Sequence, residues 1–422
     1  MNTPKRLVLL ISCIVLLFLP YFASAQSRPA VAPMQAEVRR DPFTPHIAPR
    51  AITYQRLHRV IGITGIGWGI LGLWLFLRMG YTTRLRSSLY HLLKCSLPEG
   101  ESPPPFRVLT LYVLGFLVVM RLWNLPFSLA SRGVEGYYGF LRQGLGGYFQ
   151  DMSLNLLLEC VSIPFLWGGY WLYTRSPKHW WRWVWAILTP LLLFQFVIQP
   201  ILIAPLFNTY MPLPESPLKR SIMDLAGRVG IPETRVFVED TSRRTAHVNA
   251  YVIGLGVSRR IVLNDTLLKE LPNDQILAVV GHEMGHYMEG HMWVNLVSSI
   301  LGAGFFLWLF ARLLPFQVDR LRRRGVVSHT TDIAGLPMIL LTVTLFIVLQ
   351  YPVVNLESRY LEHRADTFAL RTTHLAEATA RLQVGFAERD FADPNPPRLL
   401  HLWFGTHPTI HERIEFALSW RE

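Results

Sequence analysis

Residues 281–291, with the sequence GHEMGHYMEGH, are of the types that bind and use a metal ion. On a helix, His282 and His286 lie one turn apart on the same face, with Cβ atoms about 5–6 Å apart. Two imidazole nitrogens at this spacing can bind one zinc ion at about 2.0–2.1 Å. Glu283 projects from an adjacent face, where it can take a proton from a water without binding the metal. This HExxH pattern is typical of zinc peptidases that use the glutamate as general base.

The residues around the motif predict the helix that it needs. In the segment Leu271-Pro272-Asn273, the preceding element stops and the N-cap of a new helix follows. This helix is predicted to run over residues 274–289. An HExxH sequence can also arise by chance. Its position at the end of a helix, with Ala278, Val279 and Val280 on the inner side, argues against chance.

The third histidine, His291, fits a ligand pattern poorly. On a continuing helix it lies on the side opposite His282, since a turn takes 3.6 residues. The longer pattern HExxHxxGxxH bends the chain at a glycine, so that a later histidine can bind. That pattern needs glycine at position 289 and histidine at position 292, where this chain has Glu289 and Met292. We therefore interpret His291 as a polar residue where the chain enters the membrane, not as a ligand.

The missing ligand is predicted in residues 352–369, PVVNLESRYLEHRADTFA. Glu362 can complete a His-His-Glu zinc site that leaves a fourth position for water. Asp366, one helical turn later, can accept from the outer nitrogen of a ligand histidine and fix its tautomer. The alternative is an ordinary helix surface on which Glu362 pairs with Arg359, and the HExxH motif favours the ligand role.

Short elements precede the motif. Ser216-Pro217 is typical of an N-cap followed by proline at the first helical position, and it predicts a helix to about Gly227. Three runs rich in β-branched and aromatic residues predict strands: 235–239, 249–256 and 259–264. The edge of such a strand could hold an extended peptide through main-chain hydrogen bonds.

Long apolar blocks predict an integral-membrane protein. The chain is 51% hydrophobic and 17% charged, and its mean hydropathy is positive. Six blocks have about the 20 residues that cross a bilayer as a helix: 60–77, 108–130, 152–174, 183–204, 292–311 and 333–356. The alternative, core helices of a large soluble protein, fits poorly because core helices rarely run this long without charge. Arg121 and Glu159 interrupt two blocks, and they either pair or line a hydrated chamber unless the first span ends near Met120.

The blocks divide the chain into parts. Residues 1–25 have the pattern of a secretory signal peptide, with an uncleaved first transmembrane span as the alternative. Residues 26–59 lack periodicity and are predicted to be irregular. The remaining parts are two groups of transmembrane helices, 60–204 and 292–356, and two catalytic pieces, 205–291 and 357–422.

Basic residues beside the blocks predict the orientation. Arginines and lysines gather in the connections after the first, third and fifth blocks, which lie on one side of the membrane if every block spans once. That side should be cytoplasmic, and the catalytic part should then face outward, to the periplasm if the membrane is a bacterial inner membrane. Six arginines in 26–59 argue against this orientation. The net charge of +12 could suggest a nucleic-acid partner. The arginines cluster at the ends of the apolar blocks, which membrane topology explains better than nucleic-acid binding, so we expect no nucleic-acid partner. None of the three cysteines falls in the soluble part, which excludes a thiolate zinc site there.

At this point the chain resembles the type I CAAX prenyl proteases, which are integral-membrane zinc metalloendopeptidases. The resemblance spans most of the chain and rests on segments in the family's order: 203–216 (IAPLFNTYMPLPES), 240–254 (DTSRRTAHVNAYVIG), 259–268 (RRIVLNDTLL), 281–286 (GHEMGH), 355–366 (NLESRYLEHRAD) and 406–414 (THPTIHERI). It implies a mainly α fold in which a ring of seven helices surrounds a large intramembrane chamber, capped by a zincin-like α+β catalytic part. The apolar blocks of this chain give a polytopic membrane part of six spans plus the N-terminal signal or seventh span. The resemblance also implies one Zn²⁺ per chain on His282, His286 and Glu362, with Glu283 as base.

The resemblance assigns further residues to the substrate. It implies that His407 and Arg413 bind the substrate carbonyl or its oxyanion and that Asn249 binds substrate backbone, within the intact segment Asn249, Ala250 and Tyr251. On residues alone a His-Pro pair before a helix is more often a cap. A donor opposite the zinc is nevertheless what such a site needs, and Arg413 has no other obvious partner in the sequence.

The expected partners are a peptide or protein substrate, lipidated or not, and membrane lipid. Prenylated cytosolic proteins are poor candidates if the catalytic part faces outward. Three other functions stay open: a heat-shock-type membrane quality-control metalloprotease, a non-catalytic metal-binding membrane scaffold, and a transporter or channel. A transporter leaves the HExxH motif without a purpose, and a scaffold predicts that Glu283 is dispensable.

Overall fold

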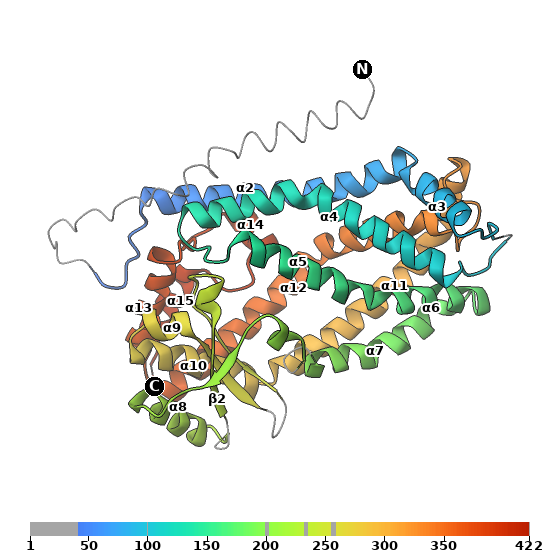
Figure 1. Cartoon of the computed structure of the whole chain (residues 1–422). Helices are drawn as coiled ribbons and strands as arrows, with labels where there is room; N and C mark the ends of the chain where they lie inside the picture. Colours follow the sequence, from blue (N-terminus) through green and yellow to red (C-terminus); the bar gives the residue numbers. More distant parts are fainter. Residues whose placement is uncertain (1–40, 99, 199–201, 232–234, 255–258, 422) are drawn as a thin grey trace.

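The computed structural model describes residues 41–98, 100–198, 202–231, 235–254 and 259–421. The predicted signal peptide or first span, 1–25, lies outside the described residues. Long helices run side by side and form most of the molecule (Figure 1). They are α2 (Pro49–Arg78), α4 (Phe106–Tyr137), α5 (Leu145–Cys160), α6 (Ser162–Arg175), α7 (Trp180–Ile198), α11 (His291–Arg323) and α12 (Leu336–Thr373).

Five helical stretches among the described residues are long and apolar enough to cross a membrane. They are 49–78, 106–137, 145–175, 291–323 and 333–373. Five of the six predicted apolar blocks lie within them. The sixth block, 183–204, falls partly in α7, which is not among the five, and partly in residues outside the description.

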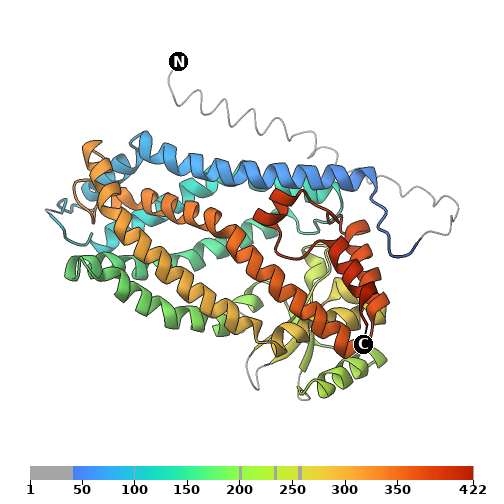
Figure 2. The same cartoon turned by 180° about the vertical axis from the view of Figure 1, so that it is seen from behind.

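The long helices form a closed ring. Each contacts the next in the order α2, α4, α6, α7, α11, α12 and back to α2, with α5 continuing into α6. An apolar cavity of about 220 Å³ lies between α6, α7, α11 and α12. The short helix α3 (Tyr81–Leu92), the α6–α7 turn and the α11–α12 turn all lie at one end of the ring (Figure 1), and the reverse view shows the same arrangement (Figure 2). The predicted membrane bundle is confirmed.

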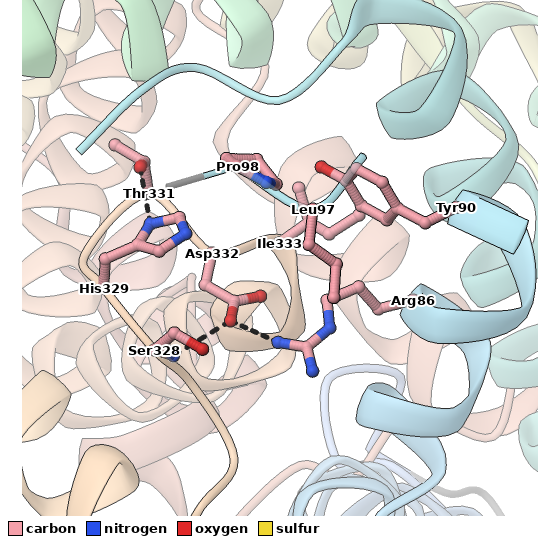
Figure 3. A pocket seen from close by; sticks show the side chains of 9 residues that line it. All are labelled: Arg86, Tyr90, Leu97, Pro98, Ser328, His329, Thr331, Asp332 and Ile333. Atoms are coloured by element: carbon pink, nitrogen blue, oxygen red, sulfur yellow. Dashed lines mark hydrogen bonds and ion pairs between the residues drawn. The ribbon is translucent and has the colours of Figure 1, made fainter. Parts of the chain in front are cut away.

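A polar cluster joins α3 to the α11–α12 turn at this end (Figure 3). Arg86 pairs with the buried carboxylate of Asp332, which also accepts from the backbone N–H of Ser328 at 3.0 Å. His329 is buried beside them, with Nδ1 2.8 Å from Oγ1 of Thr331. These residues line a cavity of about 30 Å³, large enough for a water molecule.

Helix α2 begins earlier than predicted, so the prediction that 26–59 is irregular is wrong for residues 49–59. Pro49 occupies the first helical turn, where its missing N–H leaves no hydrogen bond unmade. Ala51 and Tyr54 are then buried in an apolar cluster with residues of α4 and with Phe391. Tertiary packing therefore extends the helix beyond its apolar block.

The two charges inside the apolar blocks form an ion pair. Helix α4 continues through Met120 to Tyr137, so the helix itself does not end near Met120. Arg121 on α4 pairs with Glu159 on α5, just before the junction of α5 and α6 at Val161. Both side chains are partly exposed, so this pair is not a dry buried one.

A small sheet and further helices gather at the other end of the ring (Figure 1). The strands are β1 (Tyr210–Pro212), β2 (Arg235–Glu239), β3 (Ala250–Ile253) and β4 (Arg260–Asn264), in the order β1-β2-β4-β3. The β2–β4 pair is parallel and the others are antiparallel. Because β3 is last in this order, it is an edge strand. The helices are α8 (Pro217–Arg228), α9 (Asp265–Glu270), α10 (Asn273–Met288), α13 (Ala376–Glu388), α14 (Arg398–Phe404) and α15 (Ile410–Ser419). The predicted α+β part is confirmed.

Candidate metal centre

The HExxH helix and the end of α12 bring three possible ligands together. Nε2 of His282 lies 3.1 Å from Nε2 of His286 and 3.2 Å from Oε2 of Glu362. Nε2 of His286 lies 3.4 Å from Oε1 of Glu362. Ligands about 2.0–2.1 Å from a tetrahedral zinc ion are about 3.3–3.4 Å from one another. The donor set and its spacing therefore fit zinc, and these three residues are the one group of this kind in the described part of the chain.

The burial of Glu362 also fits a cation site. The residue is only 8% exposed, and Oε2 makes no hydrogen bond of good geometry in the described residues, although Nε2 of His282 and Nε2 of His407 lie 3.2 and 3.3 Å from it. A buried carboxylate is costly in a low-dielectric setting unless a positive charge neutralises it. A metal ion between the three donor atoms would supply that charge.

Two glycines explain how α10 and α12 come so close. Gly281 and Gly285 each precede a ligand histidine and face α12 across its small residues. A Cβ atom on Gly285 would lie 3.1 Å from Cα and from the carbonyl oxygen of Ala365. Small residues four apart let helix backbones approach, as in membrane helix pairs. The segment GHEMGH contains this pattern, which was not among the predicted features.

Asp366 lies behind the metal site, where the sequence analysis predicted it. Its Oδ1 is 2.8 Å from Nδ1 of His282, and it is 4% exposed. Arg413 donates to both carboxylate oxygens, through Nε at 2.8 Å and Nη2 at 2.6 Å. The interpretation that Arg413 has no partner is therefore wrong. Burial lowers the pKa of Arg413, but the attraction and hydrogen bonds of Asp366 outweigh it and leave a net rise.

Most of the residues that the family resemblance assigns to the substrate meet at a cavity of about 130 Å³ beside the motif. Glu283, Asn249 and Ala250 line it, together with His407 and Arg413. Burial raises the pKa of the Glu283 carboxyl above its usual range, with the neighbouring histidines opposing the rise. Such a shift moves a carboxylate toward the range in which it can take and return a proton.

His407 lies beside Glu362, whereas Tyr251 lies away from the candidate metal site. Nε2 of His407 lies 3.3 Å from Oε2 of Glu362, and its Nδ1 is 2.8 Å from Oγ1 of Thr406. Burial lowers the pKa of His407, against the attraction of Glu362. Tyr251 points elsewhere, because its hydroxyl donates to Glu239 at 3.0 Å, and successive strand side chains alternate between faces. The structure thus brings every predicted site residue except Tyr251 to the candidate metal site or to the cavity.

Comparisons with known proteins agree with this geometry. Residues 212–421 match the family model described as peptidase family M48, and residues 62–209 match the one described as CAAX prenyl protease N-terminal, five membrane helices. A Bacillus subtilis protein described as uncharacterized metalloprotease YhfN is 33% identical over 330 residues, which is 75% of each chain. This chain belongs to the CAAX prenyl protease group of peptidase family M48. The CAAX prenyl protease 1 homolog of Arabidopsis thaliana is 32% identical over 72% of this chain and 73% of its own.

A solved structure supports the fold. The crystal structure of S. mikatae Ste24p matches with a TM-score of 0.74 at 24% identity and covers 98% of this chain and 96% of the other. Family membership makes the protein a multi-pass membrane metalloendopeptidase that acts on peptides or proteins. It favours this activity over a transporter or a scaffold, and the matched N-terminal membrane helices favour it over the heat-shock type.

Proposed function

We propose that the protein is a zinc endopeptidase whose metal is held by His282, His286 and Glu362. The observation that carries the proposal is the triangle of donor atoms 3.1–3.4 Å apart beside Glu283. Bound there, zinc would act as a Lewis acid that polarises the scissile carbonyl and activates a water.

The protein's own residues then bind the peptide and move the protons. The free edge of β3, with Asn249 and Ala250 at the cavity, binds an extended substrate through main-chain hydrogen bonds. Glu283 takes the proton of the attacking water and returns it to the leaving amine. His407 donates to the developing oxyanion, and Arg413 supports it with the N–H groups that Asp366 does not use.

We propose further that the catalytic end faces away from the cytoplasm. The three basic connections lie together at the end of the ring opposite the sheet (Figure 1). Basic connections stay on the cytoplasmic side. Arg59, one of the arginines at the catalytic end, pairs with Asp393, so part of the opposing charge is neutralised. A peptide substrate, with or without a lipid, then reaches the site from outside or from the bilayer.

The test compares wild type with Glu283→Gln in detergent. Zinc content and cleavage of an unstructured peptide, with and without a farnesyl group, are measured on the same samples. We expect about one zinc per chain in both proteins and cleavage by wild type alone. Zinc in both with cleavage in neither would favour a metal-binding scaffold. The farnesyl comparison shows whether the enzyme recognises a lipid.

A further inference from the structure

His291 lies close to the metal site although the sequence pattern excludes it as a ligand. Helix α10 ends at Met288, and the chain turns through Gly290, whose φ of +68° suits glycine. Helix α11 then starts at His291, which is 3% exposed. The turn brings Nδ1 of His291 to 2.8 Å from Nδ1 of His286. The continuing helix that placed His291 on the far side is therefore not what the chain forms.

The contact involves the nitrogen of His286 that does not face the metal site. Nε2 of His286 faces Nε2 of His282 and Glu362, so its Nδ1 points outward. A histidine that binds a metal through Nε2 carries its proton on Nδ1, and this proton needs an acceptor. Asp366 is the corresponding acceptor for His282. His286 has His291 in that place.

We propose that His291 is a positioning residue of the metal centre. Its Nδ1 accepts the Nδ1 proton of His286 and so fixes the tautomer and the ring orientation of that ligand. His291 is also the first residue of α11, a membrane-spanning stretch, so the same hydrogen bond connects the membrane helix to the metal site. This role rests on the metal centre proposed above, and it differs from that of a fourth ligand because the interacting nitrogen faces His286 itself.

Two substitutions of His291 distinguish the effect of its hydrogen-bond acceptor from the effect of its ring volume. His291→Asn keeps an acceptor near the position of Nδ1, whereas His291→Phe keeps a ring without one. His329→Phe is the matched control, because His329 is also buried and its Nδ1 also has a partner at 2.8 Å (Figure 3). His329 lies in the α11–α12 turn, at the end of the ring away from the metal site (Figure 1). The full-length proteins in detergent are compared by zinc affinity in chelator competition, by the visible spectrum of the Co²⁺-loaded form, and by the melting temperature of the metal-free form.

We expect His291→Phe to weaken zinc binding about 10–100-fold and to change the Co²⁺ spectrum. His291→Asn should retain most of the affinity, His329→Phe should match wild type, and the metal-free melting temperatures of the His291 variants should stay at the wild-type value. Wild-type zinc affinity in His291→Phe would overturn the proposal, as would equal losses in Phe and Asn or a lower melting temperature with an unchanged spectrum. Failure of wild type to bind zinc would instead overturn the metal centre and this role together.

Discussion

Replacing Gly285 by alanine tests whether the close packing of α10 and α12 assembles the metal centre. The added methyl would lie 3.1 Å from Cα and the carbonyl oxygen of Ala365 and 3.1 Å from Cβ of Phe368, whereas ordinary contacts begin at 3.4 Å. The helices must therefore separate by about 0.3 Å. The contacted atoms of Ala365 belong to the backbone and cannot move aside as a side chain can. The whole of α12 must therefore shift, and Glu362, about one turn earlier on this helix, shifts with it.

The expected loss of zinc affinity follows from the free-energy cost of overpacking the contact between α10 and α12. Forcing a methyl into a packed interior costs about 1–3 kcal/mol, and about 1.4 kcal/mol is tenfold in a binding constant. Ligand distances in a zinc site tolerate only about 0.2 Å. We therefore expect Gly285→Ala to lower zinc affinity about tenfold or more, with a parallel loss of peptide cleavage, although alanine is the better helix former by about 1 kcal/mol.

Gly281 provides the control on the same helix face. There an added methyl meets Cγ2 of Thr373 at 2.5 Å, and the next neighbours, Cα and Cβ of Ala369, lie at an ordinary 3.7 Å. Serine at position 373 lacks Cγ2 but keeps the hydroxyl that donates to the Ala369 carbonyl. The double variant Gly281→Ala/Thr373→Ser should bind zinc like wild type in chelator competition. Wild-type affinity in Gly285→Ala, or equal losses in both proteins, would refute the packing argument.

Two further variants probe the polar contacts. Asp366→Asn removes the negative charge that orients His282 and should lower zinc affinity about 10–100-fold; an unchanged midpoint in chelator competition would contradict this role. Asp390 and Glu135 raise the pKa of His247 to about 9 from 6.5, so the stability it contributes is complete below about pH 6.5 and is lost as the pH rises through 9. The melting temperature of wild type in detergent should thus exceed that of His247→Gln at pH 6 but not at pH 10, and an equal difference at both values would show that charge is not responsible.

The local elements were predictable because their signals are local. Ser216 caps α8 by accepting from the N–H of Lys219, as its position before proline indicates. The predicted strand runs became β2, β3 and β4. The HExxH helix followed from periodicity and its N-terminal stop. Each of these elements is determined by residues close together in the sequence, so it can be predicted without knowledge of the tertiary fold.

What the sequence analysis missed depends on partners far along the chain. The first turns of α2 are helical because Tyr54 packs against residues of α4 and Phe391. Arg413 looked free because its partner Asp366 lies 47 positions away. His291 was placed on a continuing helix, and only the turn at Gly290 reverses that geometry. The glycine before this histidine was the one local sign of the break.

The continuity of α12 relates the metal centre to the bilayer. Glu362 follows Leu336, the first residue of this 38-residue helix, by 26 positions. At about 1.5 Å per residue this is about 39 Å of helix, against about 30 Å for the hydrocarbon core of a bilayer. If α12 enters the core at its first turn, Glu362 lies about 10 Å beyond the opposite face of the core. His291 starts a second membrane helix at the same end of the ring. With that entry point, the two spanning helices would hold the site in the interfacial layer, where water and an extended peptide are both available and a lipid attached to the peptide can stay in the bilayer.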